Sequence, residues 1–527
     1  SKDTVLNVGG TVYLNNGGII DNITYNGGTL MLGGVTSGYD NMQLGQGAGE
    51  SNVILNVNYG AIVKDLTINS SGKAILEGMD GYDSGQMLGN TVNHGLLDMS
   101  LADSGAFVEN LSGIGGTVQV GLFYHKDIPV EYHNINITNL SGSQTFVINA
   151  DLANNTADKV VIGNSATGTH YIKIDKEATA GSDLTGLTGH SATVVENAAG
   201  ASFSGVQSAV DGINVLPTIE HDGSGNWNLV GYTVTGASNL AVTAAGAANN
   251  AYAALLAADN NIQRRMGELR DNQDSAGVWV RTFGGEYDVQ GSTLKHTTIQ
   301  GGYDKVTKVA NGLSVTGITI EHLSGSSSYA HGDGKLTNTR MGIYHSWLGD
   351  SGHYYDVVVK TGKMYNELGA YDSTKISGHY RAWNTSISAE YGYRKQLAKG
   401  YFIQPQVELT LGRINGAGYT ADNGTYINQD AINSLVARAG ISVGQQLERG
   451  SYYLTASVLH EFSAKSKVTT GQGAFASTIE QDLKGTALEL ALGGNIKMGK
   501  NNNMYLEAAR SFGGKTINKW QLQAGFR

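Results

Sequence analysis

Apolar and polar side chains alternate at every position in the stretch Ile403-Gln404-Pro405-Gln406-Val407-Glu408-Leu409-Thr410-Leu411-Gly412. Successive side chains of a β-strand point to opposite faces, so this stretch predicts a strand with one apolar and one polar face. The same two-residue period runs through 386–394 and through the last residues of the chain. The fold is therefore expected to rest on long two-faced strands.

Twelve such segments, separated by turn residues, follow one another from Gly277 to the end of the sequence. An even number suits a closed antiparallel barrel in a bacterial outer membrane, where closure removes the strand edges that lipid cannot satisfy. A soluble sandwich turns its apolar faces inward, and twelve strands of this length fit a barrel better. We expect an all-β chain with a 12-stranded antiparallel transmembrane β-barrel over 277–527, with strands at 277–288, 295–308, 312–324, 335–348, 352–367, 379–398, 401–415, 430–448, 451–468, 485–499, 502–512 and 518–527.

Composition separates the chain into two parts. The 527 residues include 74 Gly and no Cys, which excludes disulfide scaffolds, thiolate metal sites and cysteine catalysis. Residues 1–235 hold 7 Lys, no Arg and 22 acidic residues, whereas the remainder carries a small net positive charge. An acidic first part repels phosphates, so nucleic acid is not expected as a partner.

The first part contains a repeat. Three segments, 17–23, 60–66 and 105–111, share one pattern at spacings of 43 and 45 residues, and each is followed by Gly and a short alternating strand. Short strands with Gly and Asn at their corners predict a right-handed parallel β-helix over 1–117. An ordinary Gly-rich β-sandwich is the alternative.

An Ala-rich segment, 241–271, joins the two parts within a linker that we place at 236–276. No apolar run in the sequence reaches the roughly 18 residues of a membrane helix, because Asn249 and Asn250 interrupt the closest candidate. We expect a helix that threads the barrel lumen, since it directly precedes the first strand; a surface linker helix is the alternative. Helical spacing of apolar residues is found at Leu255, Leu256, Ile262, Met266 and Leu269.

The first part also resembles a known family. Its repeats are similar to those of AIDA-type self-associating autotransporter adhesins, and 118–235 resembles the autochaperone cap of pertactin-like passengers, with Phe146-Val147-Ile148-Asn149-Ala150-Asp151-Leu152 among its strands. A cap covers the open end of a solenoid, whose exposed strand edge recruits other chains. The resemblance implies a passenger at the cell surface that binds a host or bacterial receptor or another copy of itself.

The second part resembles the serine protease autotransporters of enteric bacteria. The similarity begins at Asp259-Asn260-Asn261-Ile262-Gln263-Arg264-Arg265-Met266-Gly267-Glu268-Leu269-Arg270-Asp271, continues at Gly277-Val278-Trp279-Val280-Arg281, and covers 235–527. It implies type V secretion, in which an outer-membrane barrel supports export of its own passenger. Outer-membrane lipid, the barrel assembly machinery and periplasmic chaperones are the implied partners, with no cofactor.

The end of the chain bears on assembly. Members of the family usually end in an aromatic residue, whereas this sequence stops at Arg527 after Phe526. We take Trp520, Leu522 and Phe526 as the assembly signal, and expect its terminal part to be clipped.

The resemblance also implies self-cleavage. In that family the passenger is released between two Asn of the lumen helix, which match Asn260 and Asn261. The side-chain amide nitrogen of Asn260 attacks its own main-chain carbonyl, forming a succinimide and releasing the amine of Asn261. The family's lumen acids map onto Asp356, Glu390 and Glu408, which the alternation independently points inward, and buried carboxylates can assist a weak nucleophile.

A purely structural role for these acids is the alternative. In that case they only pair with Arg264, Arg265 and Arg270 and seat the helix in the lumen.

Other functions have weaker support in the sequence. A polysaccharide-acting β-helix enzyme needs clustered carboxylates in a groove, and none stands out; a porin-like channel conflicts with a helix in the lumen. Gly349-Asp350-Ser351-Gly352 mimics a protease motif but lies between two expected strands, as a turn does. Asp80, Asp83, Asp98 and Asp103 lack the spaced Gly-Asp pattern of calcium-binding repeats. No metal site and no conventional enzyme activity are therefore expected.

Overall fold

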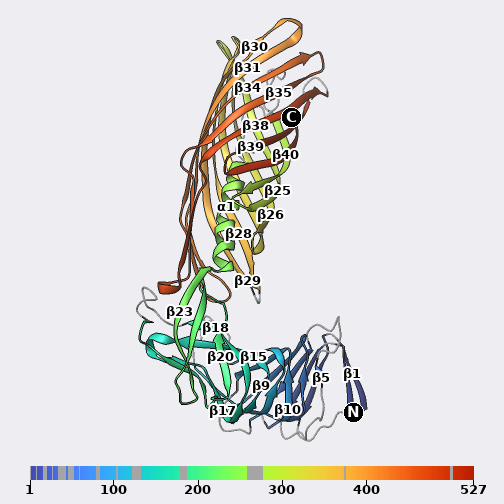
Figure 1. Cartoon of the computed structure of the whole chain (residues 1–527). Coiled ribbons are helices and arrows are strands. Elements are labelled where there is room, and N and C mark those ends of the chain that lie inside the picture. Colours follow the sequence, from blue (N-terminus) through green and yellow to red (C-terminus); the bar gives the residue numbers. More distant parts are fainter. Residues whose placement is uncertain are drawn as a thin grey trace. The chain divides into compact units, whose positions relative to one another are not determined.

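The computed structural model describes residues 2–7, 9–15, 21–26, 28–33, 43–44, 53–58, 60–78, 84–102, 105–121, 132–177, 187–257, 277–372, 375–498 and 502–527. These residues form two compact units (Figure 1). Unit 1 comprises Ser1–Ser238 with Gly471–Ala476, and unit 2 comprises Asn239–Thr470 with Ser477–Arg527.

Unit 1 is a stack of parallel strands, as a β-helix requires. Its first sheet runs in the order β2 (Thr11–Asn15), β4 (Gly28–Gly33), β6 (Val53–Val57), β9 (Gly72–Glu77), β11 (Leu96–Leu101), β13 (Ile114–Gln119), β15 (Ser143–Asp151), β18 (Gly168–Glu177) and β20 (Ala201–Gly205), with β16 (Thr156–Ala157) beside β15. The second sheet contains β5 (Gln43–Leu44), β8 (Thr67–Ile68), β10 (Gln86–Asn93), β12 (Phe107–Ser112), β14 (Asn134–Leu140), β17 (Lys159–Ala166) and β19 (Ala192–Glu196), with β7 (Ile62–Lys64) beside β10. A separate parallel pair is formed by β1 (Lys2–Asn7) and β3 (Asp21–Asn26).

The core of unit 1 is built from columns of equivalent residues. In the first sheet the column passes in register through Leu55, Ala74, Leu97, Val118 and Phe146, all fully buried. Each turn therefore covers the apolar face of the turn before it, which is how a solenoid obtains its stability.

Antiparallel strands end the stack. β22 (Ile213–His221) forms a hairpin with β23 (Trp227–Ala237), which pairs antiparallel with β19, and β21 (Ser208–Val210) adds to the outer side of β22. Phe203 packs against His170 and Trp227 at this end, with ring centroids 5.1 and 5.7 Å apart. The parallel edge is thereby covered, as expected of a solenoid cap.

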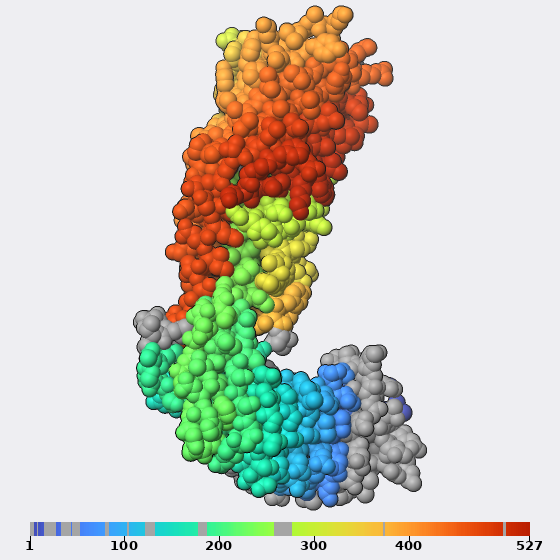
Figure 2. Space-filling model, in the orientation of Figure 1, coloured from blue at the N-terminus to red at the C-terminus, as the bar shows by residue number. Residues whose placement is uncertain are grey.

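Unit 2 is a closed antiparallel barrel whose twelve long strands lie at the twelve expected places. They are β24 (Gly277–Val289), β25 (Ser292–Val309), β26 (Gly312–Tyr329), β27 (Gly332–Gly349), β28 (His353–Tyr371), β29 (Lys375–Tyr393), β31 (Tyr401–Ile414), β34 (Ile432–Leu447), β35 (Gly450–Glu461), β38 (Gly485–Lys497), β39 (Asn503–Gly513) and β40 (Thr516–Phe526). The ring closes between β24 and β40, with Val280 opposite Phe526. Figure 2 shows the red C-terminal strands directly against the yellow-green first strands.

Two expected strands are interrupted. The segment 379–398 ends as β29 at Tyr393 and resumes as β30 (Lys395–Gln396) before the turn η4 (Ala398–Gly400). The segment 451–468 breaks after Glu461, whose Oε1 accepts the backbone N–H groups of Ser463 and Ala464, both at 2.9 Å, and so fixes a turn. The continuation joins a separate four-stranded sheet that the sequence did not indicate, formed by β32 (Ala417–Thr420), β33 (Tyr426–Gln429), β36 (Lys465–Thr470) and β37 (Ser477–Asp482).

The barrel wall is inverted relative to a soluble protein. Its inward face is polar and buried, including Gln300, Arg340 and Asn384, each at most 1% exposed. Its outward face is apolar and exposed, and includes Ile299, Ile318, Ile320, Met341, Ile343, Ile387, Val407, Leu409, Leu411, Ile441, Val443, Leu454, Leu490, Leu492, Leu506 and Leu522. Such a wall fits lipid outside and a polar lumen inside.

Helix α1 (Asn239–Ala257) lies inside the barrel, as expected (Figure 1). It starts at the end of the barrel that carries the two longest connections, where the Asn239 side chain donates to the Tyr371 carbonyl oxygen. A Cβ at Gly246 would lie 2.7 Å from Cδ1 of Tyr329, so a small residue lets helix and wall approach closely. By length and mean hydropathy α1 would suffice to cross a membrane, contrary to the sequence expectation, but 89% of it is buried inside the protein. The expected continuation to 271 lies outside the described residues.

Candidate functional site

The three acids expected in the lumen form one row across the barrel wall. Asp356 of β28 is the direct register partner of Glu390 on β29, and Glu390 is the partner of Glu408 on β31. Arg438 of β34 faces Glu408 and ends the row. Side chains at such directly opposed positions lie about 5 Å apart at Cβ, so the fold brings together acids separated by 52 positions in sequence.

Each acid of the row has hydrogen-bond or ionic contacts. Ser346 Oγ donates to Asp356 Oδ1 at 2.5 Å, and the Tyr354 hydroxyl donates to Glu390 Oε1 at 2.8 Å. The guanidinium of Arg438 lies 3.4 Å from Glu408 Oε2 and 3.9 Å from Glu489. Like charges directly opposite one another repel, and the row holds one cation for three carboxylates.

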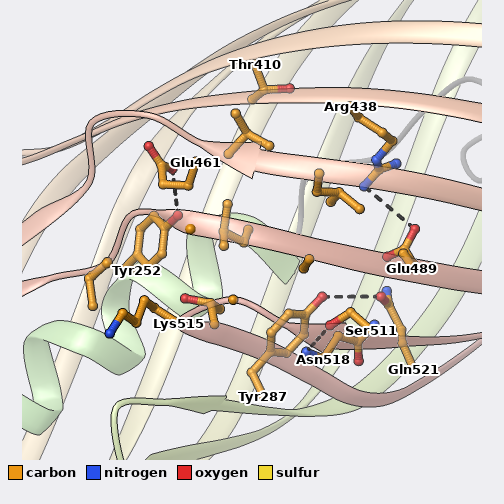
Figure 3. Close-up of a pocket in the computed structure, with 18 of the residues that line it drawn as sticks. Tyr252, Tyr287, Thr410, Arg438, Glu461, Glu489, Ser511, Lys515, Asn518 and Gln521 are labelled. Atoms are coloured by element: carbon orange, nitrogen blue, oxygen red, sulfur yellow. Dashed lines mark hydrogen bonds and ion pairs between the residues drawn. The ribbon is translucent and has the colours of Figure 1, made fainter.

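A small cavity adjoins the row near the C-terminal end of α1 (Figure 3). Its volume is about 100 Å³, and it is lined by Tyr252 and Leu256 of the helix together with Glu408 and Arg438 of the wall. The Tyr252 hydroxyl donates to Glu461 Oε2 at 2.6 Å and fixes the helix beside the cavity. The cavity is polar on the wall side and large enough for several water molecules.

A second charged network, on the neighbouring strands β24 to β28, was not anticipated. Buried Glu321 accepts from Arg340 Nε at 2.6 Å and from Lys360 Nζ at 3.1 Å. Gln300 donates to Glu321 at 2.9 Å and accepts from Arg281 Nε at 2.5 Å, which extends the network to β24. These residues occupy inward positions of the same two-residue period, so the alternation in the sequence could have indicated that they face the lumen.

The remaining predicted site residues divide between the helix and the last strand. Asn260, Asn261, Arg264, Arg265 and Arg270 all lie outside the described residues. On β40 the predicted assembly signal, Trp520, Leu522 and Phe526, is exposed on the outward face.

Arg527 has its own partner at the end of the last strand. Its guanidinium turns inward and donates to both carboxylate oxygens of Asp304.

Fold and lumen together define a class: a β-barrel of the outer-membrane type that holds a helix in its lumen, on the same chain as a parallel β-helix. Residues 278–509 match the family model described as autotransporter β-domain, and residues 108–231 match the model described as pertactin. The chain therefore carries an autotransporter β-domain, the kind of barrel that lies in the outer membrane, and a pertactin-like passenger segment before it.

Several known proteins are similar to this chain. The pertactin autotransporter of Bordetella parapertussis is 29% identical over 317 residues, covering 56% of this chain and 33% of its own length. The probable autotransporter YcgV of Escherichia coli is 26% identical over 533 residues, covering 87% of this chain and 54% of its own length. The solved β-domain of the Bordetella autotransporter BrkA is 23% identical, with a TM-score of 0.43, and covers 48% of this chain and 99% of that one. This chain thus spans about half or less of the curated relatives it matches.

Proposed function

We propose that the barrel supports export of the β-helix that precedes it on the same chain, and that the β-helix acts at the cell surface. One observation carries the proposal: the segment that joins the two parts passes as α1 through the lumen of the barrel. The first residue of α1, Asn239, therefore lies at the end of the barrel with the longest connections. In outer-membrane barrels this is the extracellular end.

Surface labelling tests the export proposal. The full chain is produced in a Gram-negative host with an epitope at the exposed turn around Gly223 of the cap. Antibody should bind intact cells. A matched epitope in the turn Ala310-Asn311, at the opposite end of the barrel, should be reached only after the outer membrane is opened. Equal labelling of both epitopes on intact cells would contradict the proposal.

For the passenger we propose adhesion or self-association. A side-chain ladder runs across three turns on its surface: Asn164 donates to Asn139 at 2.8 Å, and Asn139 donates to Asn110 at 2.8 Å. Repeated polar groups at the spacing of the turns give a long regular surface for a matching partner. Residues 108–231 match the pertactin family model, and the BrkA relative covers 80% of the chain, which supports the proposal by analogy only.

A settling assay tests self-association. Cells that display the chain should clump. If the contact is between two copies of the chain, cells that lack it should stay in suspension when the two kinds of cell are mixed. Asn139→Asp places a charge in the ladder and should reduce clumping several-fold, whereas Ser224→Asp on the exposed cap turn should not. If both variants clump like the parent, the ladder is not the contact.

We further propose self-cleavage at Asn260–Asn261. The amide nitrogen of Asn260 attacks its own main-chain carbonyl carbon, the bond to the nitrogen of Asn261 breaks, and the proton lost by the amide is transferred to that leaving nitrogen. The row of Asp356, Glu390 and Glu408 can accept and return this proton.

Intact-mass measurement on outer membranes tests cleavage. Fragments should end at 260 and begin at 261, and Glu408→Gln should slow their formation at least tenfold. Glu507→Gln, an inward acid on β39 that accepts from Tyr453, serves as control because it lies outside the row. An intact chain, unchanged by Asn260→Ala, would contradict cleavage.

Assembly is proposed to use the barrel assembly machinery and periplasmic chaperones. The exposed aromatic and aliphatic side chains of Trp520, Leu522 and Phe526 on the last strand offer an apolar recognition surface before membrane insertion. Phe526→Ser should lower the amount of folded barrel in the membrane, whereas Val278→Ser on the first strand should lower it less.

A further inference from the structure

A cluster of basic side chains lies on the outer wall of the barrel, just beyond its apolar band. Lys363 of β28, Arg381 of β29 and Arg413 of β31 are exposed on three adjacent strands. Trp383 is the register partner of Lys363, and it lies on β29 between the levels of the two arginines. We call these three cations the basic cluster.

Aromatic rings lie close to two of the three cations of the basic cluster. Lys363 Nζ lies 5.7 Å from the ring centroid of Trp383, and Arg381 Cζ lies 5.5 Å from that of Tyr365. Within the part of the chain that the structure describes, neither cation forms an ion pair. Glu367, two positions beyond Tyr365 on β28, is the neighbouring outward acid, and it accepts from the Tyr365 hydroxyl at 3.5 Å.

An apolar hollow opens in the outer wall beside the cluster. It measures about 790 Å³ and is lined by side chains of β25 to β28, among them Ile318, Met341 and Thr361. Thr361 precedes Lys363 by two positions, so both lie on the same face of β28 and the cluster borders the hollow. Gly301 deepens the hollow, because glycine has no side chain to fill the outer surface of the wall at this position. The volume is typical of ligand pockets, roughly 300–1,000 Å³.

We propose that this surface binds a phosphorylated glycolipid of the outer leaflet, with an acyl chain in the hollow and a headgroup phosphate on the basic cluster. The cluster lies toward the long-connection end of the apolar band, which is the extracellular end, and phosphorylated glycolipid forms the outer leaflet of a bacterial outer membrane. Arginine and lysine bind phosphate through charge-assisted hydrogen bonds, and Trp383 has the interfacial position that aromatic side chains favour. The inference rests on the proposed orientation of the barrel.

Lipid retention in micelles tests the proposal. The full chain is refolded in dodecylmaltoside, mixed with lipid A, bis-dephosphorylated lipid A or phosphatidylglycerol, and examined by native mass spectrometry. We expect lipid A to be retained and the other two lipids to bind at least tenfold more weakly. The double variant Lys363→Gln/Arg381→Gln should lose about tenfold in lipid A affinity, and Lys363→Arg should retain it.

Two further variants separate the hollow from the charges. Gly301→Leu should fill the hollow and weaken lipid A binding, and the Cβ has room because its nearest heavy atom is 3.6 Å away. Arg510→Gln is the matched control, because Arg510 is an outward cation over Phe512 on distant β39. Gel mobility before and after heating confirms that each variant is folded, independently of export.

Equal retention of dephosphorylated lipid A or phosphatidylglycerol would overturn the proposal. Undiminished binding by the double variant, or an equal loss in Arg510→Gln, would overturn it as well.

Discussion

At the scale of single residues, charge burial in the lumen dominates the energetics. Glu321, Arg340 and Lys360 are each at most 4% exposed, and they satisfy one another through ionic hydrogen bonds. Removing one partner from such a network leaves an uncompensated buried charge, which costs far more than the intact network contributes. The lumen wall is therefore sensitive to isosteric changes that preserve its shape.

Glu321→Gln is expected to destabilise the barrel by about 3 kcal/mol, because Arg340 and Lys360 remain buried with a neutral partner. Urea unfolding in micelles, followed by the loss of gel-mobility shift, measures the change. Asp333→Asn removes the partner of exposed Lys375 and should leave the unfolding midpoint nearly unchanged. Equal effects of the two variants would contradict the role assigned to burial.

Asp158 provides a pH-dependent term in unit 1. Burial raises the pKa of its carboxyl to about 6, against the opposing effect of hydrogen bonds from the backbone N–H groups of His133 and Asn149. The native state thus binds this proton at higher pH than the unfolded state, so the contribution of Asp158 to stability increases as pH falls from 7 to 4. Burial lowers the pKa of His170, which acts in the opposite direction.

The comparison with Asp158→Asn isolates this term, because His170 is common to both proteins. Relative to the variant, the wild type should gain about 2 kcal/mol between pH 7 and pH 4, from a shift of roughly two pKa units. Hydrogen exchange of peptides from 133–177 in urea measures the difference. A difference that does not vary with pH would refute the assignment.

At the scale of elements, the alternation of side chains was sufficient to place the twelve barrel strands and the inward direction of Asp356, Glu390 and Glu408. It could not place β36 and β37, because the break after Glu461 depends on a carboxylate that accepts two backbone N–H groups, and this is a tertiary arrangement rather than a period. Nor could it reveal that the three acids form one row, since cross-strand register is set by the turns between strands. Arg438 was missed for the same reason.

The fit of α1 in the barrel leads to a prediction at the same scale. Gly246→Val should unseat the helix, because the new side chain meets both the Tyr329 ring and Ser292 Oγ at 2.7 Å from its Cβ. Ion conductance in planar bilayers should rise above that of the parent. Tyr252→Phe removes the hydroxyl that donates to Glu461 Oε2, a hydrogen bond worth about 1 kcal/mol, and should raise conductance less. If Gly246→Val leaves the ion conductance unchanged, the helix does not seal the lumen.

At the scale of the whole molecule, the two units bury and expose opposite kinds of side chain. Unit 1 buries columns of aliphatic residues and exposes acidic and amide groups, whereas unit 2 buries polar groups and exposes aliphatic ones. The small net positive charge of the second part and the strong negative charge of the first correspond to these different surroundings.

Depth in the membrane should govern the cost of charge on the outer wall. Leu409 and Leu447 are about equally exposed, but Leu409 lies within the apolar band of β31, between Val407 and Leu411, and Leu447 lies at a turn. Leu409→Arg should cost about 2–4 kcal/mol in vesicles, and Leu447→Arg no more than about 1 kcal/mol. Equal costs in urea titrations would contradict a membrane-spanning barrel.

Because the core of unit 1 is built from in-register columns, the β-helix can change its length in steps of one turn. Since each turn presents the same faces to its neighbours, one complete turn can be removed or duplicated without changing the contacts at either end, and the height changes by about 4.8 Å, the spacing between adjacent strands. The length of the β-helix is therefore set by its number of turns, and selection can alter that length in steps without redesigning the barrel or the cap.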